Sequence, residues 1–336
     1  MTEHQNLAPQ ADVVIVHSPA YENWVFNSTH PTQGRRFTNG YNAVLEKVGS
    51  SRRIQTIEPR LATRDELALV HTSDYIKAVL DLHTCNEWDG ARPDLAKLAQ
   101  TFVGGTLEAL DQLLTGNTQV AVHLPGAKHH AQADTSSGFC VFADFAIAAK
   151  VAVAQGLKVA IFDFDAHHGD GTENLCADDP NILTYSVHEQ NLFPWTGLKS
   201  KPKKHVYNKA IKAQKLVENS NSFADIEQLI DAALEFGRLA IDFGADIIFL
   251  AAGADGHHSD QLSRLSYDTG ILIKVIGSIF HHETLSQLPV LIGGAGGYQP
   301  DDVTPKWWAE TVNHTVSFVS QPFQTTRTEN SEVGEA

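Results

Sequence analysis

The sequence has few cysteines and no long apolar segment. Its three cysteines, Cys85, Cys140 and Cys176, are far apart and include no C-x-x-C spacing, which argues against a disulfide framework and against a thiolate zinc site. The first twelve residues are polar and lack the apolar core of a signal peptide. No apolar run reaches the length that spans a bilayer. We therefore expect a cytoplasmic protein with no membrane partner.

Basic residues are also scarce. Lys and Arg total 25 against 40 Asp and Glu, which gives a formal net charge of -15. Proteins that bind nucleic acid through its backbone rely on Lys and Arg to neutralise phosphates, so no direct nucleic-acid partner is expected. The acidic balance suits a cationic partner instead, such as a lysine-rich or polyamine substrate.

Apolar runs alternate along the chain with stretches of helical character. The expected strands are 13–18, 119–125, 158–165, 182–188, 245–253 and 288–296, and the expected helices are 37–48, 64–82, 92–115, 142–155, 224–243 and 267–284. This alternation predicts an α/β fold with a mostly parallel sheet and helices on both faces. No linker or repeat interrupts it, so we expect one domain over 12–322 with flexible ends at 1–11 and 323–336.

Charged and imidazole groups follow several of the expected strands. The stretch IFDFDAHHGDG places Asp165 and His167 two residues apart, so both side chains can point to one side of an extended backbone. Asp255 follows the apolar run FLAAGA and could add a third ligand. Two carboxylates and one imidazole would leave open positions on a catalytic divalent ion. The alternative is that these are ordinary loop and capping residues.

Two further motifs could supply catalytic groups. His129 and His130 form a tandem pair that could act as general acid and base, with Asp163 and Asp170 holding the rings. The segment GGAGGY ends at Tyr298, whose hydroxyl could donate to a developing oxyanion. In a chain with 17 histidines, the alternatives are a surface histidine pair and a plain glycine-rich turn.

Taken together and in this order, the motifs resemble those of the metal-dependent histone deacetylase family. That family includes acetoin-utilisation-type deacetylases and acetylpolyamine amidohydrolases. The matching stretches lie between about residues 13 and 300, and among them are HPTQGRRF, KHHAQADTSSGFC, VAIFDFDAHHGDG, SVHEQNLFPWTG, AAGADGH and GGAGGY. The resemblance implies the arginase/deacetylase fold, with a sheet of eight parallel strands.

The resemblance also implies roles for individual residues. A single zinc, or iron in its place, would be held by Asp165, His167 and Asp255. His129 and His130 would be oriented by Asp163 and Asp170 respectively, and Tyr298 would bind the substrate carbonyl. Gly138, Phe139 and Phe193 would line the acyl-lysine channel, Asp89 would hold the substrate backbone at its rim, and Arg36 would line an internal passage for acetate. A structural potassium ion would be bound by Asp163, Asp165, His167, Ser186 and Val187.

The expected function is the removal of acetyl or other acyl groups from lysine side chains of proteins by a metal-activated water. The alternatives are a deacetylase of acetylated polyamines or other small amides, and a non-catalytic scaffold that binds acyl-lysine. A two-metal ureohydrolase fits poorly, because the sequence lacks a second set of acidic ligands. The chain departs from the family pattern at Gly34, where proline is usual, and at Trp195, where glycine is common. None of the departures removes a catalytic group.

Overall fold

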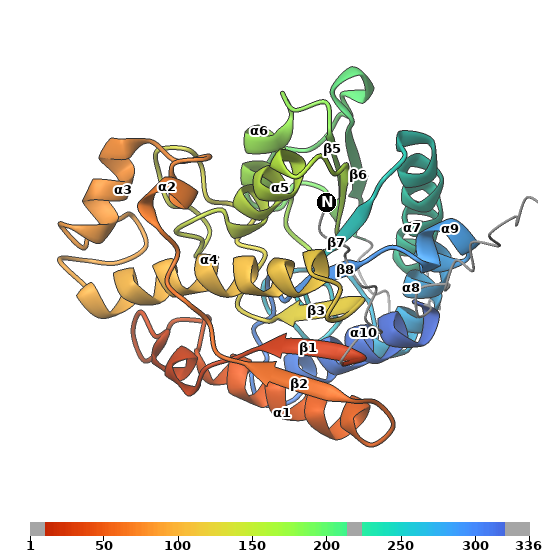
Figure 1. The fold of residues 1–336 in the computed structure, drawn as a ribbon, viewed down its shortest axis with the longest axis horizontal. Helices are drawn as coiled ribbons and strands as arrows, with labels where there is room; N and C mark the ends of the chain where they lie inside the picture. The colour runs from red at the N-terminus through yellow and green to blue at the C-terminus, as the bar shows by residue number, and fades with distance from the viewer. Residues whose placement is uncertain (1–10, 214–223, 320–336) are drawn as a thin grey trace, which may run out of the picture.

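The computed structural model describes residues 11–213 and 224–319, and eight strands within them form one sheet (Figure 1). The strands are β1 (Val13–Val16), β2 (Ile54–Ile57), β3 (Val120–His123), β4 (Val159–Asp163), β5 (Ile182–Glu189), β6 (Val206–Ile211), β7 (Ile247–Ala251) and β8 (Val290–Gly293). Their order is β2-β1-β3-β8-β7-β4-β5-β6, and every neighbouring pair is parallel. The prediction of an α/β fold with eight parallel strands is confirmed.

The two edge strands, β2 and β6, are the ones that the apolar pattern did not reveal. Central strands such as β4 and β7 are buried along their whole length, as is typical of a parallel sheet covered on both faces. All four residues of β2 are partly or fully exposed, and β6 is buried only at its two ends. A strand with one open edge and partial cover does not need a continuous apolar run, so hydrophobicity alone does not identify it.

Helices cover both faces of the sheet. One layer consists of α1 (Arg35–Gly49), α7 (Ala224–Phe243), α8 (Leu272–Phe280), α9 (Glu283–Ser286) and α10 (Val303–Phe318), and the other of α3 (Ser73–Leu80), α4 (Pro93–Leu114), α5 (Asp144–Ala154) and α6 (Asp170–Cys176). Figure 1 shows α4 along one side of β1 and β3, with α1 and α10 on the opposite side. The short helix α2 (Arg64–Leu67) and the 3-10 turns η1 (Pro19–Asn23), η2 (Pro202–Lys204) and η3 (Thr269–Ile271) complete the set.

Two of the predicted helical stretches are each divided into two helices, because a side chain caps the N-terminus of the second helix. In the stretch 64–82, Thr72 accepts a hydrogen bond from the backbone N–H of Tyr75, so that α3 begins separately from α2. In the stretch 267–284, α8 ends at Phe280 and His282 caps α9. Helices α6 and α10 were not predicted. Helix α6 is short and polar, while α10 carries Trp308, Val312 and Val316 at helical spacing on its buried side, a signal that could have been used.

The strand register positions the functional residues. Asp163 at the end of β4 lies opposite Ala251 of β7 and Ser186 of β5. Ala251 pairs in turn with Gly293 of β8, which pairs with His123 of β3. The loops that follow these strands therefore meet at one edge of the sheet, which is where α/β proteins place their ligands.

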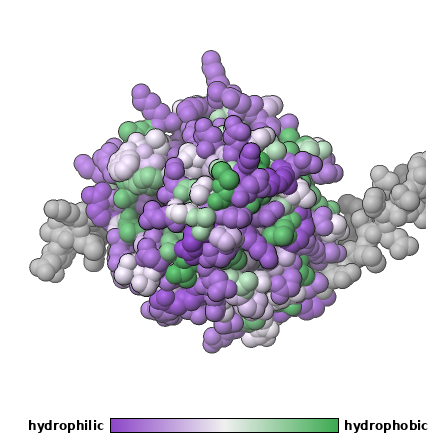
Figure 2. Space-filling model, turned by 90° about the vertical axis from the view of Figure 1, so that its left-hand side faces the viewer, coloured by the Kyte–Doolittle hydropathy of each residue, from purple (hydrophilic) through white to green (hydrophobic). Residues whose placement is uncertain are grey.

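The face of the molecule drawn in Figure 2 is largely hydrophilic. Seen from the side on which α2 and α3 lie in Figure 1, hydrophobic residues form small separate patches (Figure 2). Among the described residues, no helix is long and apolar enough to cross a membrane. The flexible ends expected at 1–11 and 323–336 fall almost entirely outside the described part of the chain and stay predictions.

Candidate active site

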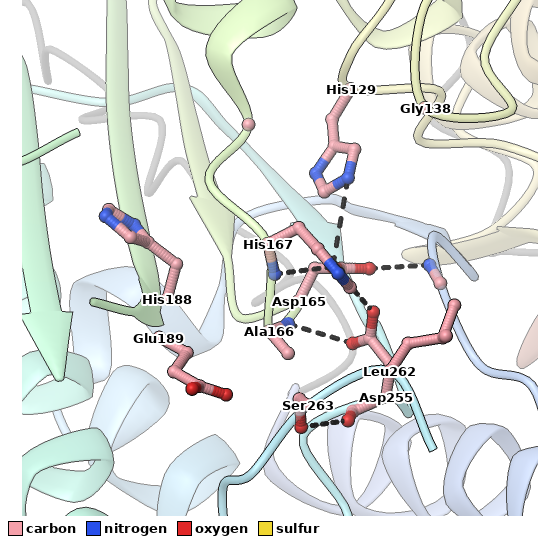
Figure 3. Close-up of polar contacts among 12 residues, drawn as sticks. His129, Gly138, Asp165, Ala166, His167, His188, Glu189, Asp255, Leu262 and Ser263 are labelled. Atoms are coloured by element: carbon pink, nitrogen blue, oxygen red, sulfur yellow. Dashed lines mark hydrogen bonds and ion pairs between the residues drawn. The ribbon is translucent and has the colours of Figure 1, made fainter. Parts of the chain in front are cut away.

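The three predicted metal ligands converge beyond the ends of β4 and β7 (Figure 3). Asp165, His167 and Asp255 are at most 8% exposed, and one donor atom from each lies within 4.8 Å of the others. The Nδ1 atom of His167 is 2.8 Å from Asp255 Oδ2 and 3.2 Å from Asp165 Oδ1. The structure thus brings together two carboxylates and one imidazole nitrogen, a set suited to an open divalent-metal site.

The charges within this cluster depend on one another. Although burial acts in the opposite direction, hydrogen bonds with Asp165 and Asp255 raise the pKa of His167 to about 11. Burial and the negative charge of Asp165 raise the pKa of Asp255 to about 7. Two carboxylates this close require positive charge between them, which the proton on His167 provides here. A divalent cation would meet the same requirement and displace that proton.

The backbone of the glycine-rich segment closes tightly around the two carboxylates. Gly296 donates its N–H to Asp165 Oδ2 at 2.6 Å, and Ala166 donates its N–H to Asp255 Oδ1 at 2.8 Å. A Cβ atom at Gly296 would lie 2.5 Å from Asp255 Oδ2 and 2.6 Å from Asp165 Oδ2, so no side chain fits there. These donors fix one oxygen of each carboxylate, as is usual for metal ligands. The residues present therefore fit a single divalent ion.

Each histidine of the tandem pair is held by one aspartate. His129 Nδ1 lies 2.7 Å from Asp163 Oδ2, and His130 Nδ1 lies 2.7 Å from Asp170 Oδ1. The other oxygen of Asp170 accepts a hydrogen bond of 3.0 Å from the Gln132 side chain. Both rings are about 4% exposed, which rejects the alternative of a surface pair. The predicted assignment of Asp163 to His129 and of Asp170 to His130 matches this geometry.

The two histidines have opposite proton affinities despite their matching contacts. Burial opposes protonation of His129, but the charges of Asp163 and Asp165 raise its pKa to about 9. Burial and the positive charge of His129 lower the pKa of His130 to about 3. The second ring is therefore neutral at pH 7 and can accept a proton, whereas the first keeps one. A cation bound to Asp165 would weaken part of the effect on His129.

Tyr298 is placed to donate a hydrogen bond. Burial and the negative charges of Asp255 and Asp165 raise its pKa well above 10, so its hydroxyl keeps its proton. The backbone N–H of Tyr298 is anchored to Asp260 Oδ2 at 2.8 Å, and the ring stands edge-on to Phe139, with centroids 6.0 Å apart. The hydroxyl has no hydrogen-bond partner among the described residues, which leaves it available to a ligand.

A cavity of about 420 Å³ leads to these groups, and we call it the outer cavity. Its lining consists of His130, Gly138, Phe139, His167, Leu192, Phe193, Leu262 and Tyr298, and is mostly apolar. The three predicted channel residues Gly138, Phe139 and Phe193 all belong to it. Gly138 has a φ of 55°, and a Cβ there would lie 2.3 Å from the His130 ring, so the wall approaches the catalytic groups closely only because this residue is glycine.

The rim of the outer cavity carries the tryptophan that departs from the family pattern. Trp195 is 71% exposed, and its ring packs edge-on against Phe193 with centroids 5.4 Å apart. The predicted rim residue Asp89 is exposed on the loop before α4 and does not line the cavity. Its neighbour Glu87 instead accepts the backbone N–H of Phe139 at 2.8 Å. This contact was not predicted, although Glu87 lies in the same sequence stretch.

A second, smaller cavity of about 10 Å³ shares the lining residues Gly138, Phe139 and Tyr298 with the outer cavity, and we call it the inner cavity. Its lining consists of Thr32, Arg36, Ala127, Lys128, His129, Gly138, Phe139, Cys140, Ala295, Gly296 and Tyr298. Arg36, predicted for an internal passage, is 3% exposed and donates from Nη1 to the carbonyl of Gly297 at 2.7 Å. Lys128 was not predicted. Its position directly before the tandem histidines is no signal by itself, because a lysine beside a histidine pair is usually exposed.

Of the residues proposed for a potassium ion, three lie on the adjacent strands β4 and β5, and Asp165 and His167 lie in the loop after β4. Asp163 and Ser186 are paired in the register of β4 and β5, and Val187 follows on β5. One oxygen of Asp163 accepts the N–H of Asp165 at 3.1 Å, and the Ser186 hydroxyl contacts His188 Nδ1 at 3.1 Å. These contacts neither require nor oppose a monovalent cation, so that site stays a prediction.

Comparison with known proteins identifies the class. The sequence pattern of the histone deacetylase domain matches residues 30–315, and this chain belongs to the histone deacetylase family of hydrolases. It is 32% identical over 319 residues to the acetoin utilization protein AcuC of Bacillus subtilis (strain 168), covering 89% of this chain and 80% of that protein. It is 29% identical over 295 residues to AcuC of Staphylococcus aureus (strain MRSA252), covering 80% and 72%.

A solved structure supports the fold. The HDA15 HD domain superposes with a TM-score of 0.74 and 20% sequence identity, covering 91% of this chain and 90% of that chain. At this level of identity the likeness concerns the architecture of the sheet and its helices.

Proposed function

We propose that this chain is a metal-dependent amide hydrolase that removes acetyl or other short acyl groups from lysine side chains of proteins. The observation that carries the proposal is the buried Asp165, His167 and Asp255 cluster beside two histidine–aspartate pairs and the free hydroxyl of Tyr298. Zinc is the proposed ion and ferrous iron the alternative, because an Asp/His/Asp set accepts either. Ligand chemistry, not the family alone, thus supports a single catalytic metal.

The residues of the chain would divide the work as follows. A divalent ion held by Asp165, His167 and Asp255 supplies Lewis-acid polarisation of the amide carbonyl and of the attacking water. His130, neutral at pH 7, takes the proton of that water, and Asp170 stabilises the imidazolium that results. Tyr298 donates its hydroxyl to the oxygen on which negative charge develops. The tandem histidines then return a proton to the leaving amine.

The outer cavity suits the stem of an acyl-lysine. Phe139 and Phe193 present apolar faces to a chain of methylene groups, each of which gains about 0.8 kcal/mol when it is removed from water. The amide is uncharged until hydrolysis, so the stem needs no counter-ion on its way in. The amine that is released becomes a cation, which the net charge of -15 favours.

The test is hydrolysis of a fluorogenic acetyl-lysine peptide by the purified protein, after treatment with a chelator and after zinc or ferrous iron is added back. We expect activity that the chelator abolishes and one equivalent of metal restores. Activity that survives complete removal of metal would refute the mechanism. A protein that holds one metal per chain and hydrolyses no acyl-lysine peptide would refute the proposed substrate.

The same site could act on acetylated polyamines or other small amides, and the acidic net charge favours such cationic molecules. Comparing kcat/KM for acetylspermidine with that for an acetyl-lysine peptide separates the two substrates. The scaffold alternative requires a silent catalytic centre, which the complete set of Asp, His and Tyr side chains argues against. We keep the potassium ion and the cytoplasmic location as proposals; the three free thiols are consistent with a reducing compartment.

A further inference from the structure

The inner cavity contains two buried cations and no acidic residue. Arg36 and Lys128 are 3% and 5% exposed, and both line the cavity together with Thr32. Two buried polar atoms there lack a hydrogen-bond partner among the described residues, Arg36 Nε and Thr32 Oγ1, and the ammonium of Lys128 forms no ion pair with a described carboxylate. Buried charges without partners are strongly unfavourable, so such a cluster needs a ligand of opposite charge.

The ammonium of Lys128 is only partly compensated by its surroundings. Nζ lies 5.9, 5.6 and 5.4 Å from the ring centroids of Trp24, Phe37 and Phe102, which gives cation–π stabilisation but no hydrogen bond. Burial and the charge of Arg36 lower the pKa of Lys128 to about 8. The side chain therefore still carries a positive charge at pH 7.

The neighbouring carboxylates are already committed to other groups. Asp144 accepts the backbone N–H groups of Lys128 at 2.7 Å and Ala127 at 3.0 Å, and it also accepts the hydroxyl of Thr106. These contacts hold the backbone at Lys128 firmly and leave Asp144 no role as its ion-pair partner. Glu87, whose charge also acts on Lys128, accepts the backbone N–H of Phe139, and Asp165 is committed to the proposed metal. No carboxylate of the described residues forms an ion pair with Lys128, so an anion from outside the chain could supply the counter-charge.

The position of the inner cavity indicates where that anion comes from. Gly138, Phe139 and Tyr298 line both cavities. When a lysine stem fills the outer cavity and its amide carbonyl meets Tyr298, the acyl end points toward the inner cavity. An apolar acyl group would leave Lys128 and Arg36 unpaired there, whereas a carboxylate would pair with both.

We propose that Lys128 and Arg36 form a carboxylate subsite at the inner end of the acyl-lysine site, which accepts acyl groups ending in a carboxylate. The inference rests on the proposed deacylase function for the substrate and on the geometry of the cavity for the carboxylate. At about 10 Å³, close to the minimum for one water molecule, the cavity favours the shortest such group, malonyl. Hydrolysis then breaks the amide C–N bond, transfers the water oxygen to the acyl carbon and a proton to the amine, and releases malonate.

The first experiment compares malonyl-lysine with isovaleryl-lysine in one peptide, using the metal-loaded protein. The two acyl groups have the same heavy-atom connectivity, and the main difference between them is the charge of the terminal group. We expect kcat/KM to be at least tenfold higher for malonyl-lysine, and the ratio to fall at least tenfold in Lys128→Met. Methionine is unbranched, is one heavy atom shorter than lysine, and suits the surrounding rings. Lys128→Arg should retain a preference, and the control Lys97→Met, at an exposed position of α4, should keep the full ratio.

The second experiment measures binding of free malonate and acetate to the same proteins by calorimetry, without turnover. If a free acid binds and its binding depends on Lys128, but malonyl-lysine is not preferred as a substrate, the subsite would be assigned to the acid released as product. Lys128-dependent acid binding in a protein that hydrolyses no acyl peptide would retain the subsite and remove the deacylase. The subsite would be refuted, and the deacylase function retained, if both the wild type and Lys128→Met hydrolyse acetyl-lysine with the same ratio of kcat/KM for malonyl-lysine to that for isovaleryl-lysine and the same affinity for free acids.

Discussion

The proposed active site consists of an acidic half and a basic half that differ in how their charges are compensated. The acidic half comprises Asp163, Asp165, Asp170 and Asp255 with the rings of His129, His130 and His167, and the basic half comprises Arg36 and Lys128. Every carboxylate of the acidic half contacts an imidazole at 2.7 to 3.2 Å. Neither cation of the basic half contacts a carboxylate within the described residues. The first half is arranged to exchange protons for a metal, and the second to receive an anion.

Removal of the imidazole between the two ligand carboxylates should have the largest effect, because the acidic half would then no longer bind metal. His167→Ala should lower bound metal from one equivalent to near zero and reduce turnover to background, because Asp165 and Asp255 alone cannot complete the set. Metal content by mass spectrometry is the measurement. His168→Gln is the matched control, since the His168 ring contacts Thr196 and Glu173 instead. Full metal occupancy in His167→Ala would mean that the ligand set is wrong.

The proton-transfer role of the acidic half is tested next. His130→Ala should lower kcat by about 10²–10⁴ while metal stays bound, as is typical when a general base is lost. His281→Ala, an exposed histidine after α8, serves as the control for loss of an imidazole. If His130→Ala turned over acetyl-lysine at the wild-type rate, the proton acceptor would have to be another group.

Tyr298 stands between the halves and should produce a somewhat smaller effect. Tyr298→Phe removes one donor to the developing oxyanion and should cost roughly 10²–10³ in kcat, with metal content unchanged. The phenylalanine ring retains the contacts with Phe139 and Arg36, so the thermal unfolding temperature should move little. Near-normal turnover would rule out the assigned role.

The buried charge of Lys128 in the basic half should lower the free energy of unfolding of the protein. Lys128 has its pKa lowered to about 8 from 10.5, so the unfolded chain binds the proton more tightly than the folded one. Lys128→Met should therefore raise the free energy of unfolding at pH 7 by about 1–3 kcal/mol, after the loss of cation–π contacts is allowed for.

The size of this effect depends on pH. The penalty in the wild type is fully present below pH 8 and shrinks as pH rises toward 10.5, because the folded chain then no longer holds a buried charge. Besides Arg36, the titratable groups that interact with this lysine include Cys140, Asp144 and Asp165, and also Glu87 and His123. Chemical denaturation of both proteins at pH 7 and pH 9.5 measures the difference, and a variant that is less stable at both would contradict the unpaired charge.

The sequence was sufficient for the parts of the protein where one physical requirement dominates. Buried parallel strands need continuous apolar runs, and metal ligands need His and Asp at strand ends, so both could be predicted. The edge strands β2 and β6 could not, because their burial is partial. The role of Glu87 depends on how the loop before α4 folds against Phe139, and no residue spacing carries that information.

Lys128 was missed for a different reason. A lysine beside a histidine pair reads as an ordinary surface residue until the packing of Trp24, Phe37 and Phe102 around it is known. Its burial results from three segments that are distant in the sequence and meet only in the folded chain. Composition could state that the protein is acidic, but not that two of its 25 Lys and Arg residues lie together beside the catalytic centre.

The wall shared by the two cavities links whatever binds on either side of it. Phe139 faces both, and its backbone is tied through Glu87 to the exposed loop before α4. A ligand that shifts Phe139 from one cavity changes the affinity of a ligand in the other, and the two affinities must change by the same factor. A small acid in the inner cavity would thus change the affinity for an acetyl-lysine in the outer cavity, whereas it would compete directly with an acyl group that ends in a carboxylate. A partner that binds the loop before α4 would affect both cavities through Phe139.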